Sequence, residues 1–251
     1  MREDLGFWIA LRFLTILPSP FRGEPSPPKV GHSLVYFPIV GLALGGILFG
    51  IDRGLSLILP SVVVNALLIV ALVIFTGALH LDGFIDTCDG LSGDSPQRRL
   101  EIMSDSHVGA FGIVGVCCLL LLKYVALLSL PNTLRLAGLL LMPTLSRWTM
   151  TYAIFAFPCV SKTSGLGQTF KQQATLQRFI IATLVTSVVT AALMRWQGVV
   201  LMVGVWLIIL GVSYFFRSRL GGLTGDTYGA VNELAEVWVL ILLPLVAGIG
   251  N

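Results

Sequence analysis

Charged residues are scarce in this 251-residue sequence. They make up 12% of it, whereas soluble domains carry about 25%. Hydrophobic residues account for 55%, and many of them stand in long apolar runs. The formal net charge is only +3 and the basic residues are scattered, which argues against a nucleic-acid-binding surface. This composition indicates a protein that crosses a lipid bilayer several times.

Cysteine and histidine are also rare and show no pattern. The four cysteines have no spacing that predicts disulfides, and no two of the three histidines are spaced to share one helical turn, which argues against a zinc site. The acidic start at Glu3 and Asp4, with no small-residue cleavage site after it, predicts no cleaved leader. Because no internal repeat is visible, we expect one membrane domain over residues 1–251.

The apolar stretches predict the fold class. A bilayer core needs about 20 apolar residues in a helix. The segment Leu5 to Leu17 is shorter, contains Arg12 and ends at Pro18, so it predicts a helix lying in the membrane interface. We expect an all-α, polytopic transmembrane bundle with this interfacial helix and about seven spans. The expected spans are 33–51, 61–80, 108–130, 136–157, 179–195, 197–215 and 233–250.

Basic residues predict the orientation. With the N-terminus in the cytoplasm, only Arg53, Arg135 and Arg195 lie in loops on the opposite side, in agreement with the positive-inside rule. The cytoplasmic segments then hold Arg2, Arg12, Arg22, Lys29, Arg98, Arg99, Lys162, Lys171, Arg178, Arg217 and Arg219.

The same orientation places the polar, glycine-rich segments 80–107, 158–178 and 216–232 together on the cytoplasmic face. One alternative stays open, because the turn at Arg195 is very short. If 179–215 is a single kinked helix, the C-terminal half is inverted.

Acidic residues gather in one region, where six of the 13 lie between positions 82 and 105. Asp82, Asp86 and Asp89 follow one another at i, i+4 and i+7, so on a helix they share a face about 60° wide. Like charges this close repel one another unless a cation lies among them, and carboxylate oxygens suit Mg²⁺, with Mn²⁺ as an alternative. We therefore expect a metal ion that binds a pyrophosphate. The other interpretation is a solvated helix end.

The residues after this cluster allow two interpretations. Asp105 stands just before the span 108–130, so it either caps that helix or adds a fourth carboxylate to the metal site. The helix N-terminus at Gly109 is favourable for a phosphate group. Arg98 and Arg99 either pair with phosphate oxygens or only mark the cytoplasmic side.

Some polar residues lie within or beside apolar spans. A charge inside a span is costly, so Lys123 and Arg147 are candidates for function. Arg147 would bind a substrate phosphate or pair with a buried carboxylate. Lys123 is either functional or extends its amino group to the interface. Among the histidines, His80 beside Asp82 is the one that we place near the site.

A second polar segment precedes the last span. Residues 221–232 are rich in glycine and include Asp226, and we expect the following helix to open with Asn232 and Glu233. This segment is either a flexible loop with an acidic first helical turn or a second polar wall facing the aspartates. In the second case Asp226, Asn232 or Glu233 would bind metal, act as a base or orient an attacking hydroxyl.

Several motifs resemble those of a known family. The stretches 76–90 and 98–112 resemble the signature of the cobalamin synthase family, the adenosylcobinamide-GDP ribazoletransferases. Further similarities lie at 13–18, 36–41, 146–148 and 222–230, in the same order, so they cover nearly the whole chain. His107 and Ile16 depart from the family pattern, because arginine is expected at both positions.

The resemblance implies a Mg²⁺-dependent transferase of the bacterial inner membrane with a cytoplasmic active site. It would transfer the adenosylcobinamide-phosphate unit of adenosylcobinamide-GDP to α-ribazole or its 5′-phosphate and release GMP, the last step in assembling the nucleotide loop of cobalamin. The implied metal ligands are Asp82, Asp86, Asp89 and Asp105, and the implied catalytic residues are Asp82, Asp226 and Glu233. The implied substrate-binding residues are His80, Arg98, Arg99, Ser106, Gly109, Arg147, Thr224 and Asn232.

Three other activities remain as alternatives. Another Mg²⁺-dependent membrane phosphoalcohol transferase would carry an Ala-Arg pair after its first aspartate, which is missing here. A membrane prenyltransferase would carry two similar acidic segments, whereas the segment around Asp226 is unlike the first. A transporter would place its charges at the membrane midplane rather than at the cytoplasmic mouth. The sequence leaves open the preferred lower-ligand base and whether the chain forms a homo-oligomer.

Overall fold

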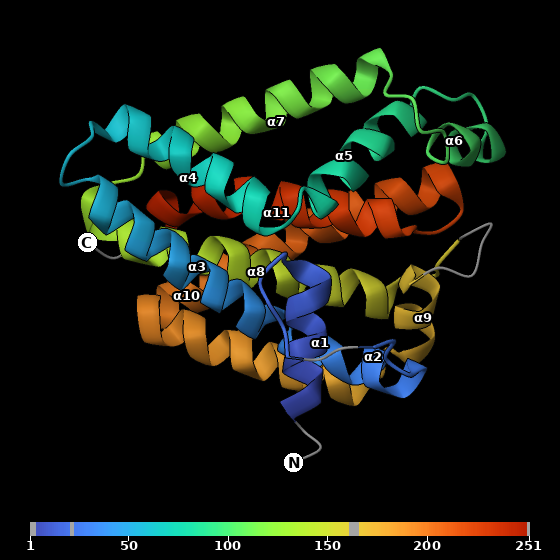
Figure 1. Ribbon diagram of the computed structural model, residues 1–251, viewed down its shortest axis with the longest axis horizontal. Coiled ribbons are helices and arrows are strands. Elements are labelled where there is room, and N and C mark those ends of the chain that lie inside the picture. Colours follow the sequence, from blue (N-terminus) through green and yellow to red (C-terminus); the bar gives the residue numbers. More distant parts are fainter. Residues whose placement is uncertain (1–3, 21–22, 161–165, 250–251) are drawn as a thin grey trace.

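The computed structural model describes residues 4–20, 23–160 and 166–249, and its regular elements are helices, as expected (Figure 1). Arg2, Arg22 and Lys162 lie outside the described residues. The helices are α1 (Asp4–Leu14), α2 (Pro27–Ser33), η1 (Leu34–Tyr36), α3 (Phe37–Leu55), α4 (Ser61–Phe75), α5 (Leu79–Gly90), α6 (Pro96–Ile102), α7 (Ala110–Leu128), η2 (Asn132–Leu134), α8 (Arg135–Ala156), α9 (Leu166–Gln173), α10 (Leu176–Leu220) and α11 (Gly225–Ala247).

Helix lengths support a membrane bundle. Within the described residues, four helices are long and apolar enough to cross a bilayer: Pro27–Leu55, α7, α10 and α11. The bent pair α4 and α5 makes a fifth if it counts as one span. Each of the seven predicted segments contains a helix, but the predicted span 61–80 is broken by a turn after α4, which has only 15 residues. Helix α8 is lined with hydroxyl groups and Arg147. The all-α membrane fold is therefore confirmed, and seven separate crossings remain a prediction.

The long helix α10 reverses its direction at Arg195. This residue has φ 52° and ψ −134°, which interrupts the helix. The Ser187 hydroxyl donates a hydrogen bond to the Met202 sulfur at 3.6 Å, whereas fifteen residues of straight helix span about 22 Å. Gly198 permits the tight turn, because a Cβ atom there would clash with the Thr190 carbonyl. The two halves are thus antiparallel, as the two predicted segments require, and a single kinked helix is excluded.

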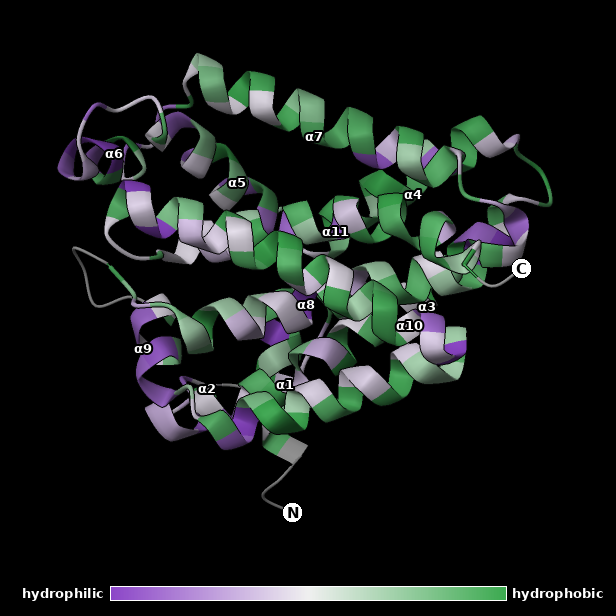
Figure 2. Ribbon diagram, turned by 180° about the vertical axis from the view of Figure 1, so that it is seen from behind, coloured by the Kyte–Doolittle hydropathy of each residue, from purple (hydrophilic) through white to green (hydrophobic). Residues whose placement is uncertain are grey.

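Helix α11 lies at the centre of the bundle and packs against α5, α7, α8 and α10 (Figure 1). Its small and branched side chains Ala230, Val231, Ala235 and Val239 are fully buried. Apolar side chains such as Val188 are instead exposed, and the outer helices consist largely of hydrophobic residues (Figure 2). Apolar surface that faces outward suits a lipid environment rather than water.

The polar segments gather at one end of the bundle. Helices α6 and α9 lie at the same end as the start of α11, opposite the C-terminus (Figures 1 and 2). Helix α1 crosses the long helices steeply and buries Ile9 and Leu14 against the bundle (Figure 1). Such a crossing is the geometry that the predicted interfacial helix requires, since a helix in the membrane plane must cross the spanning helices.

Candidate active site

The acidic helix α5 owes its direction to a sharp break after α4. Gly77 and Ala78 both have positive φ, at 59° and 56°, and the two helices meet at 91°. An alanine in the left-handed region is unfavourable by itself, so the surrounding packing must hold this turn. The bend lets α5 pack against α11 near the polar end of the bundle, where α11 begins.

Two glycines let α5 and α11 approach closely. A Cβ atom at Gly83 would lie 2.8 Å from the Cα atom of Asp226, and one at Gly229 would lie 3.0 Å from the His80 carbonyl oxygen. The absence of side chains at these two positions brings the backbones together. As a result Asp226 lies on the wall opposite α5, within electrostatic range of Asp82 and Asp86.

The start of α11 differs from the prediction. The helix begins at Gly225 rather than at Asn232, so Asp226 stands in its first turn. The cause is a capping box, in which the Thr227 amide donates to the Thr224 hydroxyl oxygen at 3.2 Å and the Thr224 amide donates to the Thr227 hydroxyl oxygen at 2.7 Å. A carboxylate in the first turn also interacts favourably with the helix dipole.

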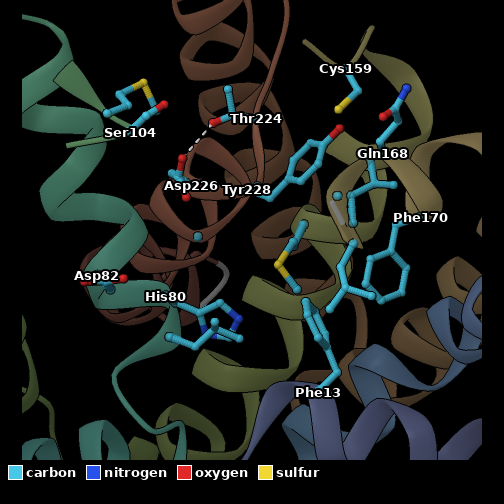
Figure 3. A pocket seen from close by; sticks show the side chains of 18 of the residues that line it. Phe13, His80, Asp82, Ser104, Cys159, Gln168, Phe170, Thr224, Asp226 and Tyr228 are labelled. Carbon is cyan, nitrogen blue, oxygen red and sulfur yellow. Dashed lines mark hydrogen bonds between the residues drawn. The ribbon is translucent and has the colours of Figure 1, made fainter. Parts of the chain in front are cut away.

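A cavity of about 520 Å³ lies between these helices, a size typical of small-molecule sites (Figure 3). Asp82 and Asp226 lie on one side of it, and Phe13 and Phe170 lie on another. Its lining residues are Phe13, Leu79, His80, Asp82, Leu100, Met103, Ser104, Met150, Ile154, Cys159, Leu166, Gly167, Gln168, Phe170, Thr224, Gly225, Asp226, Tyr228 and Gly229.

His80 lines this cavity and is only 2% exposed. Neither of its ring nitrogens has a hydrogen-bond partner among the described residues. A buried imidazole without partners is costly, and a polar group of a bound molecule would remove that cost. His80, which we expected near the site, is thus positioned to contact a ligand.

Asp89 has a different environment from Asp82. Its two carboxylate oxygens accept hydrogen bonds from the amides of Gly109 and Gly112, each at 2.8 Å, at the N-terminus of α7. The carboxylate therefore occupies the place where a phosphate was expected at Gly109, because either group satisfies the free amides of a helix start.

Asp105 lies in an exposed loop, where it accepts hydrogen bonds from the His107 amide at 3.0 Å and from the His107 ring at 2.7 Å. These hydrogen bonds hold the pKa of Asp105 below its ordinary value. Its charged neighbours are His107 and Arg98, not Asp82 or Asp86. Asp105 is therefore separate from Asp82 and Asp86 in this structure, although it lines a small pocket of about 210 Å³ together with Asp89.

The two predicted phosphate-binding arginines do not line the cavity. Arg98 pairs with Glu101 at 3.4 Å, and Arg99 donates to the Arg219 carbonyl oxygen at 2.9 Å. Ser106 is exposed in the neighbouring loop. Ser104, from the same segment, does line the cavity.

A buried ionic network lies deeper along α11. The Lys123 ammonium is 2.5 Å from both the Glu233 and the Glu236 carboxylates, and Arg147 pairs with Glu236. The Asn232 amide donates to Glu236 at 3.3 Å. Arg147 thus has a buried carboxylate partner, one of the two roles expected for it. The ion pairs and hydrogen bonds of this network involve Asn232, Arg147 and Glu233, and none of the three lines the cavity. Glu233 therefore has no access to a substrate proton in this geometry.

Glu236, Tyr228, Phe13 and Phe170 were absent from the predicted site. Glu236 stands i+3 from Glu233, so the spacing of the two glutamates along one helix is the signal that could have identified it. The aromatic residues give no local signal, because an apolar side chain looks the same in a core and in a cavity wall. Only the tertiary structure, which brings α1 and α9 to the cavity that α5 and α11 line, distinguishes the two.

The carboxylates suit Mg²⁺ in chemistry but form a small set. Among the described residues, no group of three His, Cys, Asp or Glu side chains lies close enough to hold a metal ion. Mg²⁺ in phosphate-transferring enzymes usually takes only one or two protein carboxylates, and substrate oxygens and waters supply the rest. Asp82 and Asp86, one helical turn apart and without an ion pair among the described residues, fit that requirement.

Comparison with known proteins identifies the family. The family model described as cobalamin-5-phosphate synthase matches residues 6–244. Relatives named adenosylcobinamide-GDP ribazoletransferase include one from Desulforamulus reducens, 37% identical over 94% of this chain and 95% of its own length, and one from Desulfitobacterium hafniense, 40% identical over 93% and 94%. The relative from Geotalea daltonii is 37% identical over 96% and 98%. No solved structure matches significantly. The chain therefore belongs to the cobalamin-5-phosphate synthase family.

Proposed function

We propose that this protein transfers the adenosylcobinamide-phosphate unit of adenosylcobinamide-GDP to α-ribazole or its 5′-phosphate and releases GMP. The family membership and the names of the relatives support this reaction. The observation that carries the proposal is that Asp82 and Asp226 line one cavity from facing helices, without a basic partner among the described residues. Uncompensated carboxylates in a cavity are typical of a metal-assisted site.

The reaction needs charge neutralisation on a diphosphate. We propose that Asp82 and Asp86 hold Mg²⁺, with Mn²⁺ as a substitute, through their carboxylate oxygens. When bound, the cation supplies positive charge that stabilises the transferred phosphoryl group and the leaving GMP. A metal-ligand role for Asp89 and Asp105 remains a prediction. In this structure Asp89 accepts hydrogen bonds from the Gly109 and Gly112 amides, and Asp105 accepts one from the His107 ring.

The reaction also needs an aligned alcohol and an acceptor for its proton. Asp226 is our candidate, because it lines the cavity with Asp82 and its Oδ2 atom accepts a hydrogen bond from Thr224 at 3.4 Å, which orients the carboxylate. His80 would hydrogen-bond a polar group of the substrate, which fixes the direction of attack. Glu233 is left out of this mechanism, because it is paired with Lys123 away from the cavity.

The direct test is GMP release by the purified protein, supplied with adenosylcobinamide-GDP and α-ribazole. We expect release that needs both the acceptor and Mg²⁺, is lost in EDTA and returns with Mg²⁺ or Mn²⁺. Release that is equally fast in EDTA would contradict the metal role. No release under any of these conditions, with intact protein, would contradict the reaction itself.

We further propose that the bundle lies in the bacterial inner membrane with the cavity facing the cytoplasm, as the distribution of basic residues predicts. In a variant whose native cysteines are replaced, Arg98→Cys should react with a membrane-impermeant maleimide in inside-out vesicles but not in intact spheroplasts. Arg53→Cys should show the opposite pattern. Reversed labelling of the two variants would refute the orientation.

A further inference from the structure

A second chamber of about 560 Å³ adjoins the candidate active site. Its walls come from α1, α2 and the segment before it, the start of α5, and α9. Four residues line both cavities, so the two are direct neighbours: Phe13, Leu79, Leu166 and Phe170. The remaining lining residues of the second chamber are Ile9, Arg12, Gly23, Glu24, Pro25 and Val30.

The boundary between the two chambers is aromatic and fixed. The ring centroids of Phe13 and Phe170 lie 4.8 Å apart, and Phe37 packs against both at 5.9 and 5.5 Å. Phe37 and Phe170 are buried, whereas Phe13 is partly open. Rings that hold one another in place offer a preformed surface to a flat ligand, which lowers the entropic cost of binding.

Polar groups lie at the rim of this chamber. The Arg12 guanidinium donates a hydrogen bond to the Gly23 carbonyl oxygen at 2.8 Å, and Glu24 stands next to that glycine in the chain. The other lining side chains are apolar. The carboxylates Asp82 and Asp226 belong to the first chamber only. Of the two adjoining chambers, the first is therefore acidic and the second is mainly apolar.

The two substrates of the proposed reaction differ in the same way. Adenosylcobinamide-GDP carries a charged diphosphate and a guanine with several hydrogen-bonding groups, which would remain unpaired against apolar walls at considerable cost. The base of α-ribazole is a benzimidazole with two methyl groups, which is flat and almost wholly apolar. The apolar chamber suits this base, while a diphosphate would require the acidic chamber with its cation.

We propose that the second chamber is the acceptor subsite, in which the heteroaromatic base packs against Phe13 and Phe170 while its ribose reaches through the boundary towards Asp226. This inference rests on the proposed reaction and adds the place and the chemistry of its second substrate. It makes Phe13 and Phe170 specificity-determining residues, because their rings select a broad, apolar base over a smaller or more polar one.

The test is direct binding of labelled α-ribazole to the purified protein by equilibrium dialysis, alongside binding of GDP. We expect Phe13→Leu to weaken α-ribazole binding about tenfold, the low end of what stacking on an aromatic ring contributes, and to change GDP binding less than twofold. Leu166→Trp, at an exposed position of the boundary, should block the passage and weaken the same ligand without removing a core side chain.

Phe179→Leu is the matched control, because Phe179 stacks on Phe155 with centroids 5.1 Å apart and lines neither chamber. It should leave both affinities unchanged. If wild-type protein binds α-ribazole and both boundary variants bind it equally well, or if they weaken GDP binding instead, the acceptor subsite is refuted while the reaction stands. If wild-type protein neither binds α-ribazole nor releases GMP, the proposed reaction fails first.

Discussion

Helix α11 carries carboxylates in two contrasting surroundings. Asp226, in its first turn, faces a cavity and the acidic helix α5. Glu233 and Glu236, two to three turns further along, are buried and paired with Lys123 and Arg147. The same chemical group thus stands uncompensated at one end of the helix and fully compensated in its middle.

This difference indicates that Asp226 belongs to a binding site, whereas Glu233 and Glu236 stabilise the fold. Buried charges without partners would cost several kcal/mol each, so the middle of α11 tolerates glutamates only because two cations from α7 and α8 meet them there. The network joins the three helices α7, α8 and α11. Asp82, Asp86 and Asp226 have no such cationic partners among the described residues, so a bound cation would relieve their mutual repulsion.

The largest effect is expected at the uncompensated end. Asp82→Asn and Asp226→Asn should each lower the rate of GMP release by roughly 10²–10³-fold, while thermal stability stays the same or rises because repulsion is relieved. Rates per folded molecule and melting curves in detergent measure both. Full activity in the Asp82 variant would remove this residue from the metal site.

Substitutions at the paired glutamates in the middle of α11 should instead affect stability more than activity. Glu236→Gln leaves the Arg147 and Lys123 charges poorly matched, so we expect it to destabilise the fold by about 3–5 kcal/mol. Melting after purification should fall by about 10 °C or more. Glu233→Gln is the control, and it should cost less because Lys123 keeps Glu236. Equal melting temperatures for wild type and the Glu236 variant would contradict a stabilising network.

A smaller effect is expected at Asp89, which is either a structural cap of α7 or a metal ligand. If it serves as the cap of α7, Asp89→Ala should destabilise by about 1–2 kcal/mol and speed hydrogen exchange at Gly109 and Gly112. Folded molecules should keep most of their activity. A loss of activity as great as that of Asp82→Asn would instead place Asp89 among the metal ligands.

The smallest effect is expected at exposed Asp105. The hydrogen bonds from His107 lower its pKa from 3.8, so the contact is fully formed above that pH and is lost as pH falls through the lowered value. His107→Ala should return the midpoint towards 3.8, as carbon-13 NMR of labelled aspartate can show. GMP release at neutral pH should change less than about twofold, since exposed pairs contribute little. A larger loss would bring this loop into the site.

Much of the fold was predictable because it follows from local sequence. The apolar runs predicted the all-α membrane class, and the comparisons confirmed the family that the aspartate motifs resemble. The spacing of Asp82, Asp86 and Asp89 predicted a shared helix, which α5 provides. The reversal at Arg195, left open by the short turn, was decided by contacts between Ser187 and Met202.

By itself, then, the sequence determined which segments are helical, that they suit a bilayer, and where acidic groups are concentrated. Hydrophobicity and helical period are carried by neighbours in the chain, so they can be recognised without a structure. Only the tertiary structure decided which charges are neutralised: Asp89 by the start of α7, Glu233 and Glu236 by Lys123 and Arg147, and Asp82 by none of the described side chains. The physical reason is that the energy of a buried charge depends on groups that meet it in space, and those groups come from distant helices.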